Sequence, residues 1–80
     1  MKISELLSEI GLQLSLLNGR KEYRSLSKIY KSIASGRDML IHTRSLMSDV
    51  SKFSIISEKE SHIKTELLSL LNKLEKKLIG

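Results

Sequence analysis

The chain has 80 residues, no cysteine and no proline, and a net charge of +5 from 14 Lys and Arg against 9 Asp and Glu. This length predicts one domain over residues 1–80, which buries only about 60–65% of the surface that its unfolded chain exposes. The lack of cysteine excludes disulfides and thiolate metal sites, so tight helix packing or association with another chain must support so small a core.

The sequence also restricts the location of the protein. No segment reaches the roughly 20 consecutive apolar residues that a membrane-spanning helix needs. The N-terminal stretch lacks the basic start and continuous apolar run of a signal peptide, because Glu5 and Glu9 interrupt it. We therefore expect a cytoplasmic protein.

The first predicted helix runs from about Ile3 to Leu17, with Ser4 as a candidate N-cap. Gly11 lies inside this helix, where glycine costs about 1 kcal/mol relative to alanine. Gly19 follows it and is expected to take the left-handed conformation just past a helix end. The apolar residues share one face because they recur at intervals of three and four: Ile3, Leu6, Leu7, Ile10, Leu14 and Leu17.

Two further helices follow, from about Lys21 to Ser35 and from Asp38 to about Phe53. Gly36 separates them as a second left-handed residue, and Asp38 is a good N-cap for the third helix. The second helix has an apolar face formed by Tyr23, Leu26, Ile29, Tyr30 and Ile33. The third has one formed by Met39, Leu40, Thr43, Leu46, Met47, Val50 and Phe53.

The fourth predicted helix has the clearest signals. Ser57 and Glu60, three residues apart, are typical of a capping box at its start. A continuous apolar stripe follows: Ile63, Leu67, Leu70, Leu71, Leu74 and Leu78. Near the end, where the helix dipole favours cations, stand Lys73, Lys76 and Lys77.

Four amphipathic helices with short connections predict an all-α fold, a small antiparallel four-helix bundle. A three-helix variant, in which the second and third helices are partly continuous across Gly36, stays open at this point. No stretch alternates apolar and polar residues for long enough to predict a strand.

The motifs of catalysis are missing from the sequence. It has no glycine-rich phosphate loop, no cysteine nucleophile and no histidine pair at i and i+4 for a metal. His42 and His62 are interpreted as ordinary surface or boundary residues, and the serines lack the base that a nucleophile requires. We expect a binding protein that is not an enzyme and uses no cofactor or metal.

A basic segment is the first candidate for binding. Six bases and one acid lie between Arg20 and Arg37, and four of the bases fall within a sector of about 80° on the second helix. The candidate partner-binding basic face consists of Arg20, Lys21, Arg24, Lys28 and Lys31. Such a face suits an acidic protein, a peripheral contact with an anionic membrane, or phosphates, although a solvated helix side has the same composition. Nucleic acid has little support because no aromatic residue interleaves with the bases.

Exposed apolar residues are the second candidate. Leu12 and Leu16 lie opposite the apolar stripe of the first helix, and Ile41 lies opposite that of the third. Scattered exposed apolar residues are common, but two leucines one turn apart favour a contact with a helical protein or with a second copy of the chain in a homodimer.

The helix order resembles that of a known family. The stretches that carry the likeness are 26–33 (LSKIYKSI), 40–44 (LIHTR) and 57–74, which ends LLSLLNKL. They are similar to the second, third and fourth helices of the immunity proteins that protect lactic-acid bacteria from pediocin-like (class IIa) bacteriocins. The resemblance covers roughly residues 3–78 and rests mainly on apolar spacing. It implies a basic cytoplasmic four-helix bundle that protects the producer, at a sugar-transporting permease engaged by the toxin.

Three functions follow as hypotheses. The first is a bacteriocin-immunity-like protein, which confers resistance by binding a toxin–receptor complex at the membrane. The alternative is an interaction adaptor or secretion co-chaperone that uses Leu12, Leu16 and Ile41. A nucleic-acid-binding regulator that uses the second helix is the third.

Overall fold

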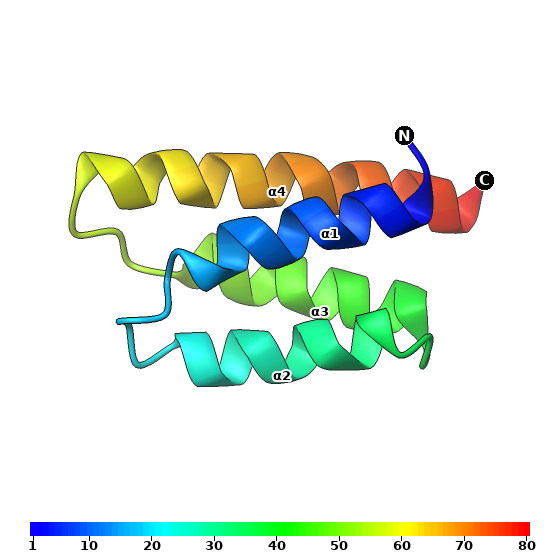
Figure 1. The fold of residues 1–80 in the computed structure, drawn as a ribbon, viewed down its shortest axis with the longest axis horizontal. Coiled ribbons are helices and arrows are strands. Elements are labelled where there is room, and N and C mark those ends of the chain that lie inside the picture. The colour runs from blue at the N-terminus through cyan, green and yellow to red at the C-terminus, as the bar shows by residue number, and fades with distance from the viewer.

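The computed structural model describes residues 1–80 as four α-helices: α1 (Ile3–Ser15), α2 (Tyr23–Ala34), α3 (Met39–Lys52) and α4 (Glu58–Ile79). The chain reverses at every connection, so both termini lie at the same end of the bundle (Figure 1). Neighbours in the chain pack together and α1 packs on α4, while the backbones of the diagonal pairs α1/α3 and α2/α4 stay farther apart. The predicted all-α four-helix bundle is confirmed.

The core is built from the apolar stripes of the four helices. Thr43 is buried with them, as its place in the predicted stripe of α3 implies, and its hydroxyl has no hydrogen-bond partner. Partly buried neighbours, Tyr30 among them, pack around the core. Fourteen apolar residues are buried: Leu6, Ile10, Leu14, Leu17, Leu26, Ile33, Leu46, Val50, Phe53, Ile63, Leu67, Leu70, Leu71 and Leu74.

The turn between α2 and α3 rules out the three-helix variant. Gly36 has a φ of 82°, a left-handed conformation that glycine adopts without the penalty of a Cβ atom. Its N–H donates to the carbonyl of Ile33 at 3.0 Å, and the N–H of Arg37 donates to that of Ser32 at 3.2 Å. This pair of bonds is a Schellman motif, which ends α2 and turns the chain back.

Two predictions about helix ends are wrong, and a third, Asp38 as the N-cap of α3, is right in position but not in its side-chain bond. Ser4 does not cap α1, because the helix begins one residue earlier and the Glu5 carboxylate accepts the N–H of Lys2 at 2.9 Å. Gly19 is not left-handed, since the chain leaves α1 through tight turns such as Leu17 N–H to Leu14 O at 3.0 Å. Asp38 precedes α3 but is itself left-handed, at φ 39°, and its side chain makes no capping bond.

The start of α4 confirms half of the predicted capping box. Ser57 Oγ accepts the N–H of Glu60 at 3.2 Å, as an N-cap should. The Glu60 carboxylate, however, accepts the N–H of Ile56 at 3.1 Å and not that of Ser57. None of the four helices combines the length and the apolar character that crossing a bilayer requires.

Candidate functional site

Four cations project from the outer side of α2 and from the turn before it. Lys21, Arg24, Lys28 and Lys31 are all exposed. None of them takes part in an ion pair, because the three ion pairs of the protein involve only Arg20 and Arg44 as cations. We call these four residues the α2 cation row.

An open hollow lies beside the α2 cation row. No acidic side chain lines it, and Tyr23 is its only apolar member. The complete lining is Asn18, Arg20, Lys21, Tyr23, Arg24, Ser25, Ser27, Lys28 and Lys31. The hollow therefore offers cations and hydroxyl groups to a ligand, and Arg20 is the only one of these cations that forms an ion pair within the molecule.

The α2 cation row lowers the stability of the helix that carries it. Arg24 and Lys28 are four residues apart, and Lys28 and Lys31 are three apart, so both pairs are neighbours on the helix surface. Like charges at these spacings destabilise a helix by about 0.2–0.5 kcal/mol per pair. The row is thus poorly explained by the stability of the fold.

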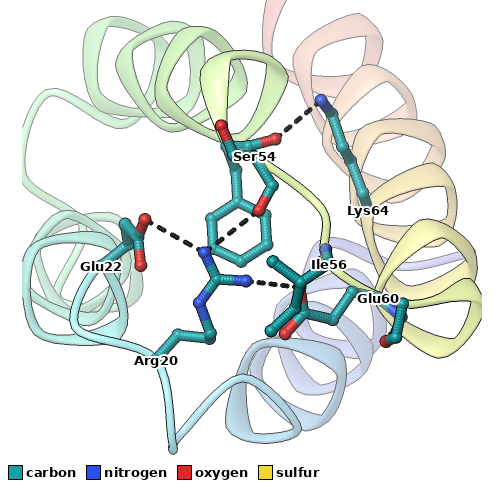
Figure 2. Close-up of polar contacts among 8 residues, drawn as sticks. Arg20, Glu22, Ser54, Ile56, Glu60 and Lys64 are labelled. Carbon is teal, nitrogen blue, oxygen red and sulfur yellow. Dashed lines mark hydrogen bonds and ion pairs between the residues drawn. The ribbon is translucent and has the colours of Figure 1, made fainter.

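Arg20 is placed differently from the other four predicted basic residues. Its side chain is only 19% exposed and turns towards the end of the bundle, as Figure 2 shows. The guanidinium binds the carboxylates of Glu60 and Glu22, donates to Ser54 O at 3.1 Å, and lies 4.5 Å from the centre of the Phe53 ring. Arg20 therefore links the α1–α2 connection to the start of α4 and to the α3–α4 linker.

A second cation, Lys64, also binds the chain where α3 ends and the α3–α4 linker begins. Lys64 Nζ donates to the carbonyl of Ser51 at 2.9 Å and to that of Phe53 at 3.0 Å. These carbonyls stand at the C-terminus of α3, where helical partners run out and a cation is favoured. Lys64 and Arg20 together hold this end of the bundle, and neither contact could be read from helix periodicity.

The three predicted apolar contact residues are exposed but do not form one surface. Leu12 is 66% exposed, Leu16 53% and Ile41 68%. Leu12 and Leu16 lie one turn apart on α1, whereas Ile41 belongs to α3, the helix diagonally opposite α1 in the bundle. Their role in binding a partner stays a prediction.

Sequence reasoning missed two exposed apolar residues. Ile55 and Ile56 in the α3–α4 linker are 46% and 75% exposed. They belong to no helical stripe, so periodicity assigned them to neither core nor surface. The available signal was their position between the end of α3 and the cap at Ser57, where two isoleucines are unusual for a connection.

The two histidines lie in different parts of the molecule, His42 on α3 and His62 on α4. Nδ1 of His42 lies 2.7 Å from the carbonyl of Arg37, and it is the donor because a carbonyl only accepts. His62 lies beside Leu16 in a shallow groove between α1 and α4. No group of three or more histidine, aspartate or glutamate side chains gathers where it could hold a metal ion.

The class that this geometry defines is a small antiparallel four-helix bundle with an unneutralised basic side. No protein-family model matches the sequence, and no significant match was found among curated proteins or solved structures.

Proposed function

We propose that this protein is bacteriocin-immunity-like: it protects the cell that makes it by binding a complex of a toxin and its receptor at the membrane, and it does so without catalysis. The observation that carries the proposal is the α2 cation row, whose charges no group in the molecule neutralises. The order of the four helices supports it, because it is the order of the family that the sequence resembles.

A protection assay tests this proposal. The chain is expressed in a strain sensitive to pediocin-like bacteriocins, and growth is measured against a panel of these toxins. We expect a raised inhibitory concentration for at least one toxin compared with an empty vector. Normal growth inhibition by every toxin, at a confirmed level of folded protein, would contradict the proposal.

A second candidate function is a protein-interaction adaptor or secretion co-chaperone. The observation that favours it is the exposure of Leu12 and Leu16 one turn apart on α1. Changing both to lysine leaves the core intact, so the adaptor hypothesis expects loss of a co-purified partner with an unchanged melting temperature. Ile56→Lys, at an exposed isoleucine of the α3–α4 linker to which the hypothesis gives no role, is the matched control. Light scattering of the same samples tests whether these leucines join two copies of the chain.

A further inference from the structure

The geometry of the α2 cation row restricts what can neutralise it. Its members follow one another at intervals of three, four and three residues. With a rise of 1.5 Å per residue, the three members on α2 span about 10 Å, and Lys21 stands in the turn before them. A row of this kind is matched by a second helix that carries carboxylates at the same intervals, because those carboxylates also lie along one face.

The surroundings of the row disfavour a lipid surface. Helices that lie on a bilayer place large apolar side chains next to their basic ones, and these insert between the headgroups. Here the hollow beside the row contains a single apolar residue, Tyr23, which is half-buried against the core. Its other members are polar or charged.

The same surroundings disfavour nucleic acid. Single strands bind where aromatic rings offer stacking platforms among the cations. Tyr30, the other tyrosine of α2, points to the interior and donates from its hydroxyl to the carbonyl of Leu7 at 2.7 Å. Ser25 and Ser27 line the hollow instead, and their hydroxyls can donate hydrogen bonds to carboxylates.

We propose that the α2 cation row docks an acidic helical segment of the partner protein, with carboxylates at intervals of three and four residues. This inference rests on the proposed function in one respect, that the partner is a protein. Binding is electrostatic and solvent-exposed, so it weakens as salt increases.

Lys28 gives the sharpest variant because it is the one member of the row with a like-charged neighbour on each side within α2. Lys28→Glu faces Arg24 and Lys31, so it turns two like-charge neighbours into two opposite-charge neighbours within α2. The helix is therefore not weakened, and lost binding cannot be attributed to unfolding. Lys73→Glu is the matched control, because exposed Lys73 has Lys76 and Lys77 at three and four residues on α4.

The experiment measures binding of a fluorescent synthetic helix with four glutamates at intervals of three, four and three, by anisotropy at two salt concentrations. Comparison probes are a peptide of the same composition with scrambled glutamates, vesicles rich in phosphatidylglycerol, and a short DNA duplex. We expect the spaced peptide to bind best, Lys28→Glu to weaken it about tenfold, and Lys73→Glu to leave it unchanged.

Three results would overturn the inference. The first is equal binding of the spaced and scrambled peptides. The second is equal weakening of peptide binding by Lys28→Glu and Lys73→Glu. Either result would mean that the net charge of the protein, and not the spacing of the row, determines binding. The third is tighter binding of vesicles or duplex than of the spaced peptide. These outcomes are measured without the protection assay, so the two proposals fail separately: peptide binding without protection rejects the proposed function and leaves the acidic-helix inference standing.

Discussion

At the scale of single residues, Gly11 and Tyr30 show how one contact overrides helix propensity. Tyr30 reaches from α2 to α1, where its hydroxyl donates to the carbonyl of Leu7. A Cβ atom at Gly11 would lie only 2.6 Å from Tyr30 Oη. The glycine in the middle of α1 is therefore explained by the close approach of a tyrosine that is distant in the sequence.

A double-mutant cycle tests this explanation. Gly11→Ala alone should give less than the roughly 1 kcal/mol of stability that alanine normally contributes, because Tyr30 must shift and its hydrogen bond weakens. In a Tyr30→Phe background, which lacks the Oη atom, the same change should stabilise more, with a coupling of about 0.5–1.5 kcal/mol. Urea unfolding of the four proteins measures it, and strict additivity would contradict the contact.

The same tyrosine makes stability depend on pH in the alkaline range. Burial raises the pKa of Tyr30 above its ordinary value of 10.0, because the phenolate would be poorly solvated. Its contribution to stability is complete below pH 10 and is lost as the pH rises through the raised pKa of the folded state.

We therefore expect the stability advantage of the natural protein over Tyr30→Phe to shrink above about pH 10. The free energy of unfolding of both proteins, measured by denaturant between pH 8 and pH 11.5, checks this. Lysine titration affects both proteins alike and cancels in the difference. A difference that is constant over this range would show that Tyr30 titrates as it does in the unfolded chain.

At the scale of secondary-structure elements, α2 is distinguished by an outer face whose charged residues are all cations. The apolar face of α2 packs as its periodicity predicts, with Leu26 and Ile33 buried. Its outer face works against helix stability, which a row of alternating charges would not do. Sites that bind often retain residues that are not the most stable choice for the fold.

Lys28→Glu should therefore stabilise the isolated protein. Two repulsive neighbours become attractive, and the expected gain is about 1 kcal/mol, equivalent to several degrees in melting temperature for a domain of this size. Thermal unfolding followed by circular dichroism at low salt measures the gain, which should fall at 1 M salt because these charges are exposed. A destabilised variant would mean that Lys28 contributes to the fold.

At the scale of the whole molecule, contacts of Arg20 hold together the end of the bundle opposite the termini. One guanidinium joins carboxylates from α2 and α4 and a carbonyl of the α3–α4 linker (Figure 2). The Glu60 side chain is only 13% exposed, so its carboxylate depends on this cation for compensation.

Arg20→Met keeps an unbranched apolar side chain but removes the guanidinium that lies over Phe53, leaving two carboxylates without their partner. We expect a loss of about 2–3 kcal/mol in the free energy of unfolding, partly recovered in Arg20→Met/Glu60→Gln. Arg44→Met is the control, because the more exposed Arg44–Glu75 pair should contribute at most about 1 kcal/mol. Equal losses for the two arginines would show that Arg20 acts only as a surface charge.

The sequence alone was sufficient for the all-α fold class, the order of the helical segments and most of the residues that face the core, whereas the choice between four helices and three was settled by the structure. Apolar spacing carries that information, because a helix must bury its stripe whichever neighbour it packs on. It also identified Gly36 as the end of α2, since a left-handed residue is a local requirement. The exposure of Leu12, Leu16 and Ile41 followed from the same periodicity.

Only the tertiary structure decided where Arg20 points, why Gly11 is a glycine and which partner Glu60 has. Each answer depends on residues far apart in the chain: Arg20 and Glu60 are separated by 40 positions and Leu7 and Tyr30 by 23. Side chains at helix ends respond to whichever connection packs beside them, and periodicity does not encode this. The five basic residues that looked equivalent in the sequence were therefore separated by packing into one structural cation, Arg20, and four free ones.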